Sequence, residues 1–138
     1  MMIDIDNFKS FNDTYGHNVG DDVIREVSRL LVKYFGIDHC YRIGGDEFLI
    51  ISGFGKKGCE DRIESLRDEL SSFETDGKKL SPTISCGIYR GACDYDNNLR
   101  SLKESADQLL YRVKKNGKNG FAYEADPFLP EKDVEIGI

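Results

Sequence analysis

The chain has 138 residues, of which 32% are charged and 39% hydrophobic, and its formal net charge is −6 at pH 7. This length fits one domain with a single hydrophobic core, and the acidic balance argues against a general nucleic-acid surface, which would be basic. The four cysteines form no CxxC pair, and the sequence contains no signal peptide or apolar stretch of membrane length. We therefore expect a cytoplasmic domain with reduced thiols and no membrane partner in this chain.

The start of the chain predicts a strand followed by two helices. The strand is the apolar run 1–5, and we expect Asp6 to cap a short helix that ends at Gly16. Asn18 is the expected N-cap of a longer helix, because apolar residues recur after it with the helical period. Gly36 closes this second helix.

A β-hairpin is expected within about 39–52, where two β-prone runs flank the pair Gly44 and Gly45. A tight hairpin turn needs positive φ, and glycine reaches positive φ without strain. Two carboxylates, Asp46 and Glu47, follow the glycines at once. Adjacent negative charges repel and a hairpin tip does not need them, so this pair marks a candidate site.

The second half of the chain alternates helices with strands. In order we expect a helix over 59–73, a polar turn over 75–79, a strand over 83–89, a helix over 99–113 capped by the loop 94–98, and a strand over 121–123. From Glu124 onward the chain is acidic and has no period, which predicts a loosely held tail over 124–138. Strands interleaved with helices, together with one hairpin, predict an α+β fold in which helices pack on a mixed sheet.

The first strand ends in the acidic step Asp4-Ile5-Asp6, which together with Asp46 and Glu47 could hold a divalent cation. Asp4 ends the strand, and Asp46 follows the hairpin turn. If these strands are neighbours, both carboxylates reach one point and can offer hard oxygen ligands to a divalent cation. The simpler interpretation is that Asp4 is a solvated acid at a strand end and Asp46 a turn residue.

Residues 44–48, Gly-Gly-Asp-Glu-Phe, spell the signature of the GGDEF domain, the diguanylate cyclase family. The run 4–21 resembles the family's opening motif, and the run 105–119 is similar to its closing motif. The resemblance spans about residues 1–123, and it implies a palm-like fold related to adenylyl cyclase and polymerase palms, with the signature on a central β-hairpin.

The resemblance implies that two GTP molecules are joined into cyclic di-GMP with loss of two pyrophosphates. Each domain would hold one GTP, and two domains would face each other. A catalytically weak GTP-binding regulatory module is the alternative function.

In the family, positions matching Asp4, Asp46 and the carbonyl of Ile5 bind Mg²⁺ or Mn²⁺. Asp46 also matches the residue proposed to help remove the proton of the ribose 3′-hydroxyl. Lys9 is the second candidate catalytic residue, as a partner of the phosphates. Glu47 is either a second metal ligand or an acid that supports the hairpin.

Asn12 and Asp21 match the family's guanine readers, and a carboxylate can accept from the N1–H and N2–H donors of guanine. Asp21 could equally favour the helix dipole. Lys114 and Lys118 are candidate phosphate partners, although lysines are also expected at a helix C-terminus. Phe8 and the amides after Asp6 are candidate phosphate contacts, with core packing as the alternative for Phe8.

Two departures from the family pattern matter. The inhibitory product site Arg-x-x-Asp corresponds here to residues 35–38, Phe-Gly-Ile-Asp, and the loss of the arginine predicts no strong product inhibition by that route. The family usually has a helix and a connecting segment before the first strand, which lead to a regulatory domain that brings two cyclase domains together. We expect that this chain lacks that segment and is slow on its own at low concentration.

Overall fold

The computed structural model describes residues 1–94 and 98–129. Its elements are β1 (Met2–Ile5), α1 (Phe8–Tyr15), α2 (His17–Phe35), the 3-10 turn η1 (Ile37–His39), β2 (Cys40–Arg42), β3 (Glu47–Ile50), α3 (Lys56–Leu70), β4 (Glu74–Thr75), β5 (Lys78–Lys79), β6 (Ile84–Arg90), α4 (Leu99–Lys115) and β7 (Gly120–Ala125). Five strands form one sheet in the order β2-β3-β1-β6-β7, antiparallel except for the β6–β7 pair. The predicted α+β fold with a mixed sheet and flanking helices is confirmed.

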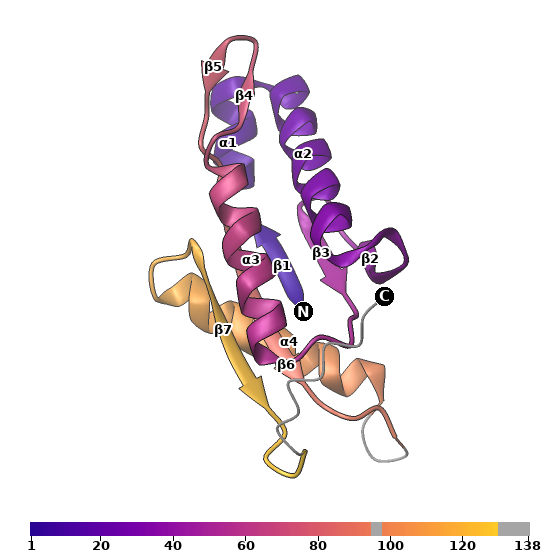
Figure 1. Ribbon diagram of the computed structural model, residues 1–138. Helices are drawn as coiled ribbons and strands as arrows, with labels where there is room; N and C mark the ends of the chain where they lie inside the picture. Colours follow the sequence, from indigo (N-terminus) through magenta and orange to yellow (C-terminus); the bar gives the residue numbers. More distant parts are fainter. Residues whose placement is uncertain (95–97, 130–138) are drawn as a thin grey trace.

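The sheet separates two layers of helices (Figure 1). Successive strand residues point to opposite faces, and β1 follows this rule: Ile3 and Ile5 join the large core with α2 and α3, whereas Met2 packs with Ala106 and Leu110 of α4. The alternation therefore directs Asp4, two residues after Met2, toward the α4 side of the sheet.

Helix α4 lies very close to the central strand β6 because β6 carries Gly87 at the crossing. A Cβ atom on Gly87 would lie 2.1 Å from the backbone oxygen of Ala106 and 2.5 Å from the nitrogen of Leu110. Only a residue without a side chain allows this approach. The close contact sets the height of α4 over the sheet and thereby the position of its last turn.

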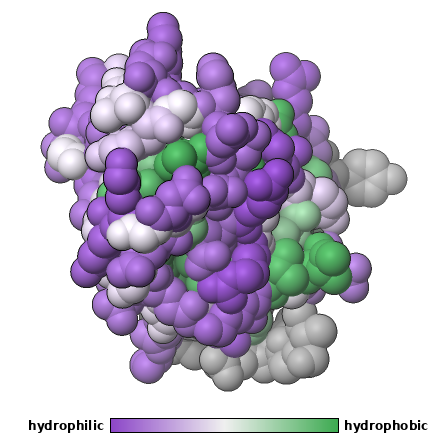
Figure 2. Space-filling view, turned by 90° about the horizontal axis from the view of Figure 1, so that it is seen from above, coloured by the Kyte–Doolittle hydropathy of each residue, from purple (hydrophilic) through white to green (hydrophobic). Residues whose placement is uncertain are grey.

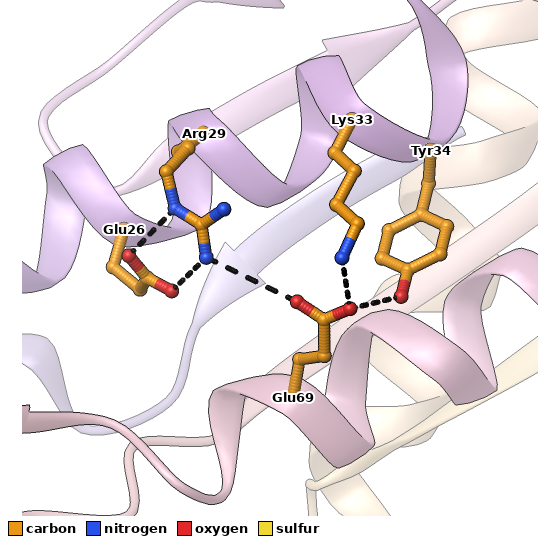
Figure 3. Close-up of polar contacts among 5 residues, drawn as sticks. All are labelled: Glu26, Arg29, Lys33, Tyr34 and Glu69. Atoms are coloured by element: carbon orange, nitrogen blue, oxygen red, sulfur yellow. Dashed lines mark hydrogen bonds and ion pairs between the residues drawn. The ribbon is translucent and has the colours of Figure 1, made fainter.

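Helices α2 and α3 are joined on their solvent side by a polar cluster (Figure 3). Glu69 of α3 accepts hydrogen bonds from Lys33 and, at 2.5 Å, from the hydroxyl of Tyr34. Arg29 approaches Glu69 at 3.9 Å and donates to Glu26 at 2.7 Å. The cluster lies on the helix faces away from the sheet.

The helix starts differ from the sequence prediction. Asp6 does not cap α1: the N-cap is Asn7, which has a left-handed φ of 54° and makes no side-chain cap bond. Helix α2 begins at His17 with Gly16 as its N-cap, so the prediction of Asn18 as N-cap is wrong. Both helix ends at glycine, Gly16 and Gly36, are confirmed.

The turns also differ from the prediction. Gly44 and Gly45 do not have positive φ, so the expected reason for the glycine pair is wrong; the loop is closed instead by the amide of Ile43 donating to the carbonyl of Glu47 at 3.0 Å. The predicted polar turn over 75–79 is part of a small hairpin, β4–β5. Its central residues Asp76 and Gly77 have φ of 50° and 73°, the pattern of an Asp-Gly hairpin turn.

The other elements lie close to their predicted places. Helix α3 ends at Leu70, so Phe73 packs against the core from beyond the helix. Asn98 caps α4 by accepting from the amide of Ser101 at 3.0 Å. Strand β7 runs on to Ala125, and the part of the predicted tail from residue 130 lies outside the described residues.

The surface seen from above is mainly hydrophilic, with smaller hydrophobic areas among the polar side chains (Figure 2). Within residues 1–94 and 98–129, no helix is both long enough and apolar enough to cross a membrane.

Candidate active site

The two candidate metal-binding carboxylates lie side by side because β1 and β3 are antiparallel neighbours. Asp4 pairs with Glu47 across the two strands, and the amide of Ile5 donates to the carbonyl of Asp46 at 3.1 Å. Asp4 and Asp46 line one cavity of about 230 Å³. This cavity also brings together other predicted site residues: Ile5, Phe8, Lys9, Lys114 and Lys118.

Asp4 is buried, with 7% of its surface exposed. Burial raises the pKa of Asp4 to about 6; a hydrogen bond from Lys114 opposes this rise and the neighbouring Asp46 adds to it. Lys114 donates to Oδ2 of Asp4, whereas Oδ1 has no hydrogen-bond partner in the part of the chain that the structure describes. An orphaned buried carboxylate oxygen beside a second carboxylate is a good ligand for a cation.

A metal ion in this cavity would depend on few protein side chains. Among the described residues there is no group of three or more His, Cys, Asp and Glu side chains that could hold a metal ion. Two carboxylates fit Mg²⁺ nevertheless, because Mg²⁺ is commonly held by one or two carboxylates together with waters and substrate phosphates. The donor set therefore fits a hard divalent cation that arrives with a phosphorylated substrate.

The lysines of the site come from both ends of the chain. Lys114 lies in the last turn of α4, and Lys118 follows the turn after it, where the amide of Lys118 donates to the carbonyl of Val113 at 3.0 Å. The side chain of Lys118 donates to Oδ1 of Asn7 at 2.6 Å. Lys9 lies in the first turn of α1 and is exposed. Three ammonium groups thus face or border the carboxylate pair.

The predicted guanine readers lie outside this cavity, at the junction of α1 and α2. Oδ1 of Asn12 is buried and has no partner within the described ranges. It lies against Gly20, where an added Cβ would be only 1.7 Å away. Asp21 is the next residue on α2 and is exposed. The contact with Gly20 brings the amide of Asn12 next to the start of α2, which carries Asp21.

Of the remaining predicted site residues, Phe8 lines the cavity and Glu47 lies beside the hairpin turn. The carboxylate of Glu47 is exposed and lies over Gly44, where a Cβ would be 2.8 Å from Oε2; Glu47 does not line the cavity. Phe8 both lines the cavity and packs against the core, so its two proposed roles are compatible.

Asn7 and Ser10 also line the cavity, and the sequence analysis predicts no role for them in the site. Asp6 lines it too; the sequence signal for Asp6 is its place in the acidic step that ends the first strand, beside its predicted role as a helix cap. At the corresponding product site, Phe35 is a core residue with 2% exposure, while Asp38 is exposed in η1.

Curated proteins are similar to this chain in sequence. The chain is 39% identical over 124 residues to "Diguanylate cyclase A" of Treponema denticola, covering 86% of this chain and 33% of that protein. It is 32% identical over 126 residues to "Diguanylate cyclase DosC" of Escherichia coli K12, covering 86% and 26%. The chain therefore spans a third or less of the length of these curated relatives.

Solved structures are similar as well. The active GGEEF domain of a diguanylate cyclase from Vibrio cholerae superposes with a TM-score of 0.77 at 28% identity, covering 88% of this chain and 79% of that one. The GGDEF domain of DgcB from Caulobacter crescentus, solved in complex with c-di-GMP, has a TM-score of 0.75 at 31% identity and covers 88% and 74%. The family model described as "Diguanylate cyclase, GGDEF domain" matches residues 1–120, and the chain belongs to the GGDEF domain family.

Proposed function

We propose that this domain is a diguanylate cyclase, which joins two GTP molecules into cyclic di-GMP and releases two pyrophosphates. The observation that carries the proposal is the Asp4–Asp46 pair, which shares one cavity with Lys9, Lys114 and Lys118. Such a site suits a triphosphate, because a cation bridges the acids and the phosphates while ammonium groups balance the remaining charge. The names of the relatives and the DgcB complex add support.

A Mg²⁺ or Mn²⁺ ion held by Asp4, Asp46 and the carbonyl of Ile5 would neutralise the triphosphate and polarise the α-phosphorus. The free Oδ1 of Asp4 is the ligand oxygen already available for it. Lys114 donates to Asp4 in the structure, and in the substrate complex we expect its ammonium group to contact a phosphate. The role of Glu47 as a further metal ligand stays a prediction.

The reaction forms one bond and breaks one bond at each α-phosphorus. The 3′-oxygen of one GTP bonds to the α-phosphorus of the other, and the bond to the pyrophosphate oxygen breaks. Asp46 accepts the proton of the 3′-hydroxyl, while Lys9 and Lys118 stabilise the charge that develops on the phosphates. Since each domain holds one GTP, two domains must face each other for the reaction to occur.

Guanine selectivity rests on Asn12 and Asp21. A carboxylate accepts from both N1–H and N2–H of guanine, a donor pair that adenine lacks. The orphaned amide oxygen of Asn12 adds an acceptor next to it. The amides that follow Asp6, at the start of α1, are further phosphate contacts in this proposal.

The same proposal covers the cell compartment and the regulation of the reaction. All four cysteines are free thiols, which suits a reducing cytoplasm. A regulatory domain in the longer protein would bring two cyclase domains together. With Phe35 where the family has arginine, we expect no strong product inhibition through the Arg-x-x-Asp route.

The test is to incubate the protein with GTP and Mg²⁺ at several protein concentrations and to measure cyclic di-GMP by chromatography. Asp46→Asn removes the proposed base and metal ligand, and we expect it to abolish product. Asp61→Asn is the matched control, because it removes the same charge from the exposed surface of α3. We expect the wild type and the control to yield product faster than linearly with protein concentration.

Metal-dependent GTP binding without product would favour the alternative, a GTP-binding regulatory module. Absence of both product and binding from the folded protein would overturn the proposed function.

A further inference from the structure

Both oxygens of the Asp6 carboxylate accept hydrogen bonds, whereas only one oxygen of Asp4 does so among the described residues. Oδ1 accepts from the hydroxyl of Ser85 at 2.6 Å, and Oδ2 accepts from the hydroxyl of Thr83 at 2.7 Å and from the amide of Asn119 at 2.9 Å. The amide of Asp6 donates to the carbonyl of Thr83 at 2.9 Å. Asp6 therefore joins three segments: the end of β1, the start of β6 and the turn between α4 and β7.

The turn and the loop that Asp6 holds are strained. Asn7, Lys118 and Asn119 have φ of 54°, 60° and 48°, a region that is unfavourable for a residue other than glycine and persists only where surrounding contacts enforce it. Those contacts are present, because Lys118 donates to Asn7 at 2.6 Å and Arg67 donates to Asn119 at 2.6 Å. Strain enforced at a cavity marks a segment whose shape matters.

We propose that Asp6 is a positioning residue of the active site. Its carboxylate holds the loop after β1 against the turn after α4, so that Lys118 and the amides at the start of α1 face the phosphates of one GTP. This inference rests on the proposed function, and it assigns to Asp6 a role that differs from those of Asp4 and Asp46, since Asp6 acts through the groups that it orients.

The competing role for Asp6 is that of a third metal ligand, because it lines the same cavity. Its hydrogen bonds argue against this role: each oxygen already accepts from at least one donor, and Oδ2 accepts from two. A metal ion on Oδ2 would have to displace Thr83 or the amide of Asn119, and on Oδ1 it would share the oxygen with the hydroxyl of Ser85. Asp4 has the open oxygen, whereas Asp6 has none without a donor.

Two substitutions separate the roles. In Asp6→Asn the amide oxygen can still accept from Thr83 and Asn119, and the NH₂ group can donate to the hydroxyl of Ser85. The three hydrogen bonds therefore survive, but the negative charge is lost. In Asp6→Ala the hydrogen bonds and the negative charge are both lost. Thr83→Val is a milder variant. Valine has the shape of threonine but no hydroxyl, so only one of the three hydrogen bonds to the Asp6 carboxylate is removed.

The first readout is the affinity for 3′-deoxy-GTP with Mg²⁺, measured by titration calorimetry, since this nucleotide binds but cannot form the new bond. We expect Asp6→Ala to weaken affinity about tenfold, Thr83→Val about threefold and Asp6→Asn less than about twofold, from typical hydrogen-bond contributions. The second readout is hydrogen exchange of the Asn119 amide by NMR. We expect exchange to be at least about tenfold faster in Asp6→Ala, intermediate in Thr83→Val and unchanged in Asp6→Asn.

If Asp6→Asn weakens affinity as much as Asp6→Ala while the Asn119 amide stays protected, the charge is what matters and Asp6 is a metal ligand, which overturns the inference. Wild-type affinity and exchange in Asp6→Ala also overturn it. If Asp6→Ala does not fold, Thr83→Val decides in its place. Failure of the wild type itself to bind the nucleotide would instead refute the proposed function, and the exchange rates would still show whether Asp6 holds the turn.

Discussion

Oδ1 of Asn12 is buried against Gly20 of α2 and has no hydrogen-bond partner among residues 1–94 and 98–129. A larger residue at that position would displace the Asn12 side chain, because a Cβ there would stand 1.7 Å from its Oδ1. A buried acceptor without a partner costs stability, and a ligand that supplies the donor recovers this cost. The guanine base is such a ligand in the proposed function.

Gly20→Ala is predicted to weaken GTP binding by displacing Asn12. Alanine is a better helix former than glycine by about 1 kcal/mol, so the helix itself should not suffer. We expect the affinity for 3′-deoxy-GTP to fall about tenfold, as for the loss of one good hydrogen bond in a buried site, and Asn12→Ala to show a similar loss.

Gly58→Ala is the control, since it adds the same methyl group on α3, where the nearest atoms would be 3.3 Å away. Wild-type affinity in Gly20→Ala, with Asn12→Ala impaired, would show that Asn12 reaches the base in another way.

Helices α2 and α3 owe part of their mutual position to Glu69 (Figure 3). Hydrogen bonds from Lys33 and Tyr34 lower the pKa of Glu69 below its ordinary value of 4.5. The same hydrogen bonds stabilise the folded protein as long as Glu69 is ionised. The effect is local to this helix pair, because the cluster lies away from the sheet and the cavity.

The stabilisation by Glu69 should depend on pH in a definite direction. Because the pKa is lowered on folding, the contribution is present above about pH 4.5 and is lost as the pH falls through the folded-state pKa. We expect the difference in urea midpoint between the wild type and Glu69→Gln to be largest near neutral pH, to shrink below pH 4.5 and to decrease with added salt.

Glu74→Gln, at an exposed position on β4, serves as the comparison because it makes the same substitution outside the Glu69 cluster. A difference for Glu69→Gln that stays constant from neutral to acidic pH would contradict the ion-pair explanation.

The whole fold is needed to assemble the cavity, since Lys114 and Asp4 are 110 residues apart in the chain. They meet because α4 packs closely over Gly87 and because β1 lies in the middle of the sheet. In the free protein the ammonium group of Lys114 compensates for part of the negative charge of a carboxylate pair that a bound cation would otherwise neutralise.

Ligand and metal should therefore stabilise the fold only together. At a nucleotide concentration of 100 times Kd, mass action adds about 2.7 kcal/mol to the free energy of unfolding. We expect 3′-deoxy-GTP with Mg²⁺ to raise Tm by several degrees and EDTA to remove the increase, because the phosphates then face Asp4 and Asp46 without a cation. Thermal unfolding measures this. An equal increase in the presence of EDTA would argue that the metal is not part of the site.

The elements whose pattern is local could be predicted from the amino-acid sequence alone. The helical period of α2, α3 and α4, the glycine ends of α1 and α2, and the alternation in β6 were predictable because they depend on neighbours within a few residues. The signature at 44–48 and its two companion motifs identified the family. They also named Asp4, Asp46 and the lysines that line the cavity.

Which polar groups meet in space depends on how distant segments of the chain pack together. Asp6 was predicted as a helix cap, a local role, but its donors come from β6 and from the turn after α4. Likewise, the glycine at position 44 adjoins the side chain of Glu47 rather than adopting a positive φ. The physical reason is the same in both cases: a polar side chain bonds to whichever donors the packing of distant segments brings near, and chain position alone does not reveal that packing.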